Sequence, residues 1–164
     1  MTEIPSFQTI LEGIHGTDYD LPDKLLAFDP GETIGWAYFE FATPTKITQS
    51  TKFDDFRLAS IGLETIIREH KPDVVVIEDY RIYEQKAKAH SWGKLFTVKV
   101  IAAIETLCAQ REIPVVLQMA SAKQFCSDEK LKAWGFYQSG KPHANDAVRH
   151  GCYYLLFHNR SGGA

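Results

Sequence analysis

Three acidic residues stand at positions where folding alone does not require a carboxylate. Asp29 follows the apolar run 25–28, Glu78 follows the apolar run 74–77, and Asp146 lies in the first turn of a helix expected over 143–157. Carboxylates that lie close together repel one another unless a cation shares them, and the hard ions Mg²⁺ and Mn²⁺ prefer oxygen ligands. Two such ions about 4 Å apart can activate a water and stabilise the leaving oxygen in phosphodiester hydrolysis. If the two strands are neighbours, the pattern predicts a site for Mg²⁺ (or Mn²⁺).

A histidine accompanies the third carboxylate. His143 precedes Asp146 by three residues, so both project from one side of the expected helix. His150 lies on that side too, beyond the edge of the apolar stripe, and we expect none of the three to be a core residue. His143 can ligate a metal or take a proton from an attacking water, because an imidazole titrates near neutral pH.

Each of these residues also has a purely structural explanation. Asp29 precedes Pro30 and Gly31 and could serve only to form a turn. Glu78 could be a solvated charge at a strand end, and Asp146 could complement the helix dipole. Their order, their placement at strand ends and the i, i+3 spacing together favour a shared site.

The elements that must position these residues follow from periodicity and turn signals. Short apolar or β-branched runs predict strands, and 3.6-residue periodicity predicts helices. We expect strands at 25–28, 34–41, 45–53, 74–77 and 113–117, and helices at about 55–70, 91–111 and 143–157, with shorter helices from 121 and 128. Short connections join the first three strands antiparallel, and the later strands add parallel to them. The prediction is an α/β fold with a mixed five-stranded sheet, three antiparallel then two parallel strands, and helices on both faces.

The length of 164 residues suits one domain with two appendages. Residues 1–23 form an acidic N-terminal extension, in which four apolar residues at helical spacing (Phe7, Ile10, Leu11 and Ile14) predict a short docked helix. Residues 24–158 form the folded domain, and 159–164 are a C-terminal tail. The three cysteines (Cys108, Cys126 and Cys152) are too few and too far apart for a zinc site, and we expect reduced, packed thiols.

Charge and composition limit the partners of the chain. The net charge is −3, but residues 1–80 are acidic and residues 81–164 are basic. A local cationic surface is therefore possible, although the two parts could also interleave on folding. No apolar run approaches the roughly 18–20 residues of a membrane span, and the N-terminus lacks the pattern of a secretory signal. We expect a cytoplasmic protein with no membrane partner.

Three stretches of the chain together resemble the RuvC-type Holliday junction resolvases, especially the small phage-encoded ones. Residues 25–31 (LLAFDPG) with 34–37 (IGWA) resemble the opening of that family, and 74–78 (VVVIE) resemble its second acidic strand. Residues 143–147 (HANDA) are similar to its closing helix, which carries two acidic residues or a histidine and an aspartate. The similarity runs from about residue 24 to 157 and implies the ribonuclease H-like fold.

The resemblance implies a homodimeric, metal-dependent endonuclease that nicks two strands of a branched DNA, the four-way junction, symmetrically. Asp29, Glu78, His143 and Asp146 would then form the metal and catalytic set, with Asp29 bridging two ions. Hydrolysis would leave 5′-phosphate and 3′-hydroxyl ends. Lys123 looks like the family's lysine after the fifth strand and could stabilise charge on the phosphate, although it could equally be a solvated lysine. The host cytoplasm would be the location if a phage encodes the chain.

A basic and aromatic stretch follows the second acidic strand. Cations neutralise phosphates and exposed aromatic rings stack on unpaired bases, so we expect DNA binding by six residues: Tyr80, Arg81, Tyr83, Lys86, Lys88 and Lys94. The resemblance implies a junction-wedging aromatic just after the strand, where this sequence has Arg81. Trp92 and Phe96 are interpreted as core or dimer contacts.

Other functions fit the same elements. The chain could be a ribonuclease H-like nuclease acting on RNA or an RNA–DNA hybrid, or a non-catalytic nucleic-acid-binding module of the same fold. An actin-like ATPase is disfavoured, because 164 residues supply only one of the two lobes that such a fold needs.

Overall fold

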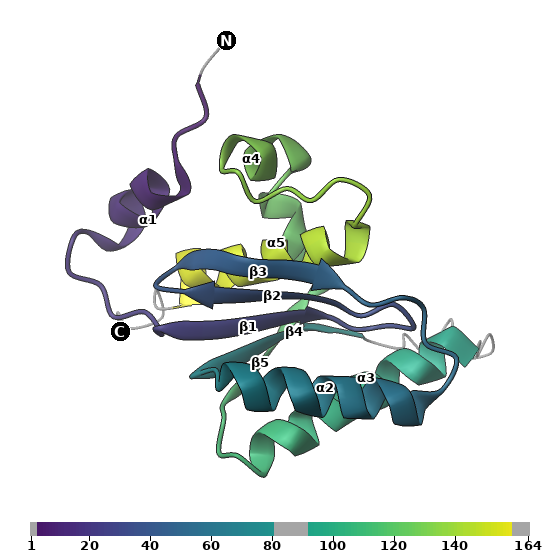
Figure 1. The fold of residues 1–164 in the computed structure, drawn as a ribbon. Coiled ribbons are helices and arrows are strands. Elements are labelled where there is room, and N and C mark those ends of the chain that lie inside the picture. Colours follow the sequence, from purple (N-terminus) through teal and green to yellow (C-terminus); the bar gives the residue numbers. More distant parts are fainter. Residues whose placement is uncertain (1–2, 81–91, 159–164) are drawn as a thin grey trace.

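A five-stranded sheet forms the centre of the computed structural model, which describes residues 3–80 and 92–158 (Figure 1). The strands are β1 (Lys24–Asp29), β2 (Gly35–Glu40), β3 (Thr43–Gln49), β4 (Val74–Asp79) and β5 (Val115–Met119), in the order β3-β2-β1-β4-β5. β1, β2 and β3 pair antiparallel, and β4 and β5 join them parallel. The predicted mixed sheet is confirmed.

Helices cover both faces of the sheet, as predicted. One face carries α2 (Phe56–His70) and α3 (Trp92–Ala109), and the other carries α5 (Pro142–Phe157) (Figure 1). A second layer lies beyond α5, and it comprises α1 (Phe7–His15), the 3₁₀ helix η2 (Ala120–Phe125) and α4 (Asp128–Ala133). This second layer means that α5 is covered on more than its sheet-facing side.

Strand alternation decides which face each side chain reaches. In β1, Leu25 and Ala27 belong to the core under α5, whereas Leu26 and Phe28 belong to the core under α2 and α3. All four are completely buried, as a central strand requires. Continuing the alternation by one residue directs Asp29 to the α5 face of the sheet.

The hairpin between β2 and β3 differs from the prediction. The chain reverses at Phe41 and Ala42, which adopt φ of 48° and 61° as a two-residue hairpin turn requires. β3 therefore begins at Thr43, and Pro44 lies inside this edge strand, where a missing N–H is tolerated. The expected strand at 45–53 was wrong in its bounds, because we assigned the turn to Pro44.

The N-terminal segment carries the predicted helix and is docked on the α5 side. Phe7 and Leu11 of α1 are buried in the core beneath that side. Trp134 Nε1 donates to the Pro5 carbonyl (3.0 Å), and His15 Nε2 lies 2.8 Å from the Leu155 carbonyl oxygen. The division of the chain at residue 24 and the tail at 159–164 stay predictions.

The three cysteines are buried and unpaired, as predicted. Within the part of the chain that the structure describes, no helix is both long and apolar enough to cross a membrane.

Two glycines let α5 approach the sheet at backbone distance. A Cβ on Gly35 in β2 would lie 2.0 Å from the His143 carbonyl oxygen, and one on Gly151 would lie 2.3 Å from a ring atom of Phe39. The first clash is with backbone, which cannot move without shifting the start of α5. Gly35 therefore fixes how closely the helix carrying His143 and Asp146 docks on the sheet.

Gly35→Ala is expected to lower the free energy of unfolding by about 3 kcal/mol, because overpacking against backbone forces α5 outward. Urea denaturation of the two proteins measures the difference. Gly13→Ala is the matched control: nothing lies within 4 Å of that position in α1, so alanine should stabilise the helix by about 1 kcal/mol. Equal stability of Gly35→Ala and the native protein would contradict the close approach.

Candidate active site

Two strand ends bring the first pair of carboxylates to one place. Phe28 of β1 pairs with Ile77 of the parallel strand β4, and Asp29 and Glu78 are the next residues of these strands. Glu78 shares the α5 face with Val74 and Val76 by the same alternation that places Asp29 there. The two carboxylates therefore lie at the same edge of the sheet, beneath the start of α5.

The N-terminus of α5 is held over these strand ends by β3. Oε1 of Gln49 accepts hydrogen bonds from the backbone N–H groups of His143 (3.1 Å) and Ala144 (3.2 Å), which have no partner within the helix. Pro142 occupies the first turn, where its fixed φ favours helix initiation. As a result the half-exposed His143 ring reaches Asp29, with Nδ1 2.7 Å from Oδ2.

Lys123 joins the remaining two carboxylates. Its ammonium, carried by η2, lies 3.2 Å from Oε2 of Glu78 and 3.0 Å from Oδ2 of Asp146. The lysine is thus held in two ion pairs rather than extended into solvent. The structure brings together the whole predicted set of catalytic residues: Asp29, Glu78, Lys123, His143 and Asp146.

His150, which we expected on the same side of the helix as His143 and Asp146, contacts the cluster from a buried position. Its side chain is 0% exposed, so the prediction that it is not a core residue was wrong. Nε2 lies 2.9 Å from Oε2 of Glu78, and Nδ1 lies 2.8 Å from Oε1 of Gln118. The error arose because the apolar positions of α5 alone do not show that the polar ends of β4 and β5 lie beneath this margin of the helix. Its i, i+4 spacing from Asp146 was the available signal.

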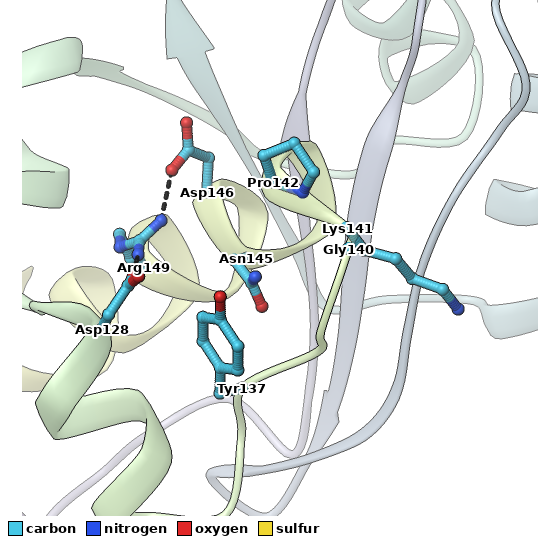
Figure 2. A pocket seen from close by; sticks show the side chains of 8 residues that line it. All are labelled: Asp128, Tyr137, Gly140, Lys141, Pro142, Asn145, Asp146 and Arg149. Atoms are coloured by element: carbon cyan, nitrogen blue, oxygen red, sulfur yellow. Dashed lines mark hydrogen bonds and ion pairs between the residues drawn. The ribbon is translucent and has the colours of Figure 1, made fainter.

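Arg149 supports Asp146 from the opposite side, a role that the sequence analysis did not anticipate. The guanidinium donates to Asp146, to Asp128 and to the Cys126 carbonyl. Figure 2 shows this guanidinium between the two aspartates, beside a pocket that Tyr137 also lines. Arg149 lies one turn after Asp146 on α5, and its ion pair restrains the orientation of the Asp146 carboxylate.

Two carboxyl groups of the cluster, Asp29 and Glu78, have pKa values that depart from the ordinary range in opposite directions. Burial, together with the negative charges of Glu78 and Asp146, raises the pKa of Asp29 to about 6, although the hydrogen bond from His143 lowers it. Burial would also raise the pKa of Glu78, but His150 and Lys123 hold it below its ordinary value. The pKa of Asp29 is thus raised by burial and by two neighbouring carboxylates, whereas that of Glu78 is lowered by two basic partners.

The donor set fits a hard divalent ion. Three carboxylates and one imidazole surround the strand ends, and Asp29 is influenced by both other carboxylates. Among residues 3–80 and 92–158, no three His, Cys, Asp or Glu side chains are close enough together to coordinate one ion without moving. The Lys123 ammonium lies between two of the carboxylates. Asp29, Glu78, His143 and Asp146 are the candidate ligands.

Solved structures share this arrangement of elements. The chain superposes on Thermus thermophilus RuvC in complex with a Holliday junction substrate with a TM-score of 0.64 at 14% identity, covering 86% of this chain and 97% of that one. A Thermus thermophilus RuvC structure gives 0.63 at 12% identity, with 85% and 96% covered. The chain has the RuvC fold.

The yeast mitochondrial Holliday junction resolvase Ydc2 is also similar to this chain, with a TM-score of 0.57, 14% identity, and coverage of 94% of this chain and 89% of Ydc2. No protein-family model and no curated protein sequence matches the chain. The likeness to RuvC is therefore one of fold.

Within this RuvC fold, the predicted DNA-binding residues are only partly described. Tyr80 follows β4 and packs partly against the core under α3, and Lys94 is half-buried near the start of α3. Arg81, Tyr83, Lys86 and Lys88 lie outside the described residues. Phe96 is a core residue as interpreted, whereas Trp92 is 53% exposed and is not part of the core.

Proposed function

We propose that this chain is a divalent-metal-dependent endonuclease that resolves four-way DNA junctions by symmetric phosphodiester hydrolysis. The observation that carries the proposal is the convergence of Asp29, Glu78 and Asp146 at the end of the parallel strands, on a RuvC fold. Such a concentration of negative charge favours divalent cations, and the neighbouring RuvC structure holds a Holliday junction substrate.

We propose a role for each side chain of the cluster. Asp29, Glu78, His143 and Asp146 would hold Mg²⁺ or Mn²⁺, two ions per site, with Asp29 between them. When bound, the ions supply an activated water and stabilise the leaving 3′-oxygen, so the products carry 5′-phosphate and 3′-hydroxyl ends. The ammonium of Lys123 is close enough to Glu78 and Asp146 to approach a phosphate bound at the same place and neutralise its developing charge.

His143 can act as a proton acceptor as well as a ligand. Donation from Nδ1–H to Asp29 leaves the lone pair of the ring on Nε2, because a neutral imidazole carries one proton. The His143 side chain is 46% exposed, so solvent reaches the ring. An aspartate that orients a histidine in this way fixes the tautomer that accepts a proton.

Binding of the junction is assigned to the segment that follows β4. Tyr80, Arg81, Tyr83, Lys86, Lys88 and Lys94 provide cations for phosphates and rings for unpaired bases. The segment begins at Tyr80, which follows the last residue of β4 and lies two residues after Glu78 in the sequence. We assign the protein to the cytoplasm, or to the host cytoplasm if a phage encodes it.

A second copy of the chain is the proposed partner of the outer face of α3. This helix is apolar on both sides: Phe96 and Val100 face the core, while Leu95 and Val98 are 45% and 40% exposed. Leu117 and Met119 on the edge strand β5 are also exposed. A helix that is apolar all round is ordinarily buried, and a junction with two symmetric cut positions suits a two-fold dimer.

Leu95→Glu combined with Val98→Glu is expected to convert a dimer into a monomer, because a buried, unpaired carboxylate opposes association. Size-exclusion chromatography with light scattering gives the mass. The monomer should keep its fold by circular dichroism and lose coordinated cutting of both strands. Lys99→Glu on the same exposed helix is the charge control. A native protein that is monomeric at micromolar concentration contradicts the proposal.

Cleavage assays separate the candidate functions. We expect cutting of a synthetic four-way junction with Mg²⁺ or Mn²⁺, no cutting in EDTA, and no cutting by Glu78→Gln. End-labelled strands show whether the two nicks are symmetric and carry 5′-phosphates. Preferential cutting of an RNA–DNA hybrid would instead indicate a ribonuclease H-like enzyme, and binding without cutting by the native protein would indicate a non-catalytic module.

A further inference from the structure

His150 is a completely buried polar side chain beneath the candidate metal ligand Glu78. It is carried by α5, one turn after Asp146, and its ring is 0% exposed. A polar group taken out of water is costly unless it is hydrogen-bonded, and both ring nitrogens of His150 have partners. The two partners, Glu78 and Gln118, come from different strands.

The sheet register explains why one ring reaches both partners. Glu78 of β4 pairs directly with Gln118 of the parallel strand β5, so both side chains project toward α5. Gln118 lies two residues after Val116 in β5, so the two side chains share one face of the sheet. Val116 packs against the core under α5. His150 therefore lies over two side chains whose spacing is set by strand pairing.

The hydrogen bonds constrain Glu78 directionally. A carboxylate has no proton to give, so Nε2–H of His150 donates to Oε2 of Glu78 over 2.9 Å. On the other side of the ring, Nδ1 lies 2.8 Å from the carboxamide of Gln118. A carboxamide has both a donor and an acceptor, so Gln118 can hydrogen-bond to Nδ1 while Nε2–H donates to Glu78. The ring is therefore held between two partners on neighbouring strands.

We propose that His150, oriented by Gln118, is a positioning residue that fixes the Glu78 carboxylate for metal binding. The proposal rests on the proposed function only in taking Glu78 as a ligand. Glu78 also contacts Lys123, which draws it toward Asp146, so a second, buried contact is needed to keep the carboxylate aligned with its strand end. A group that hydrogen-bonds to a metal ligand orients that ligand and increases the affinity for the metal, although it does not contact the ion.

His150→Leu tests the proposal, because it fills a similar volume without a donor. Titration calorimetry of the full chain with MnCl₂, without DNA, should show an affinity for Mn²⁺ lower by about ten- to a hundredfold. His150→Gln keeps an N–H donor and should recover part of the loss. Junction binding in EDTA should be unchanged in both variants.

Two further variants keep the result interpretable. Val148→Ala removes buried volume from the same helix without touching Glu78, and it should lower the unfolding temperature but not the Mn²⁺ affinity. If His150→Leu does not fold, Gln118→Leu removes the partner that orients the ring and should weaken Mn²⁺ binding to a smaller extent. Mn²⁺ binding by His150→Leu equal to that of the native chain, or an equal loss in Val148→Ala, would overturn the proposal.

Glu78→Gln shows which proposal fails. If Glu78→Gln weakens Mn²⁺ binding and His150→Leu does not, the metal site stands and only the role of His150 is wrong. If Glu78→Gln binds Mn²⁺ like the native chain, Glu78 is not a ligand, and the metal site of the proposed function fails together with the role of His150.

Discussion

Asp29→Asn is expected to reduce junction cleavage by more than about a hundredfold and, in the absence of metal, to stabilise the fold. The loss of activity follows because the substitution removes the charge of one of the proposed metal ligands. The gain in stability has a separate cause: burial of this carboxyl, together with the charges of Glu78 and Asp146, raises its pKa to about 6. An ionised Asp29 at neutral pH therefore opposes folding, and asparagine removes that charge.

The pH dependence has a definite sign. The pKa of Asp29 rises from 3.8 to about 6 on folding, so the folded state binds its proton more tightly than the unfolded chain does. The favourable contribution of the protonated Asp29 carboxyl to the free energy of unfolding is complete below about pH 4 and is lost as the pH rises to about 6. The difference between Asp29→Asn and the native chain should grow over that window and stay constant above it, at no more than about 3 kcal/mol.

Glu78→Gln is the matched control, with the opposite sign. His150 and Lys123 hold the pKa of Glu78 below its ordinary value despite burial, so its charge stabilises the fold. This variant should lose cleavage as completely as Asp29→Asn but should unfold at a lower temperature than the native chain in EDTA. Urea denaturation between pH 4 and 8 measures both variants. Destabilisation by Asp29→Asn at pH 7 would contradict the repulsion described for this site.

The convergence of the site could be predicted because it depends on simple periodicities. A strand buried on both faces is a continuous apolar run, and its first polar residue marks the edge of the sheet, as Asp29 and Glu78 do. Their shared direction toward α5 follows from counting residues along each strand. The i, i+3 spacing of His143 and Asp146 places both on one side of that helix, over the same edge.

The remaining contacts depend on tertiary packing that local patterns do not encode. His150 lies at the margin of the apolar stripe of α5, and its buried ring contacts Glu78 of β4 and Gln118 of β5, whose pairing local patterns do not reveal. Gln49 caps α5 from a strand far earlier in the chain, and its role requires knowledge of the sheet order. The β2–β3 turn was missed because Phe41 and Ala42 lack the usual glycine or asparagine signal for positive φ.

Lys123→Met should produce the second large effect, a loss of cleavage of about a hundredfold accompanied by a stronger response to metal. Methionine keeps most of the length of the side chain but removes the ammonium, which lies 3.2 Å from Glu78 and 3.0 Å from Asp146. Without it, these two carboxylates repel each other, and the metal-free protein should unfold at a lower temperature. A divalent ion bound there no longer has to displace a positive charge.

Thermal unfolding over a Mn²⁺ titration separates these two effects. Burial opposes the charged form of Lys123, but Asp146 and Glu78 raise its pKa, so the native lysine is an ammonium throughout the neutral range. The increase in unfolding temperature with Mn²⁺ should therefore be larger in Lys123→Met than in the native chain. Lys132→Met on the exposed side of α4 makes the same change of charge outside the site and should alter neither cleavage nor the response to Mn²⁺.

Lys123→Arg distinguishes charge from shape. An arginine keeps the positive charge but is planar and bulkier than an ammonium. We expect it to restore the stability of the metal-free protein, because it can still pair with Glu78 and Asp146, and to restore cleavage only in part. If Lys123→Met instead responds to Mn²⁺ more weakly than the native chain, the lysine and the ions do not compete for the same carboxylates. The two carboxylates that contact Lys123 would then not be the ligands of the ions that cleavage requires.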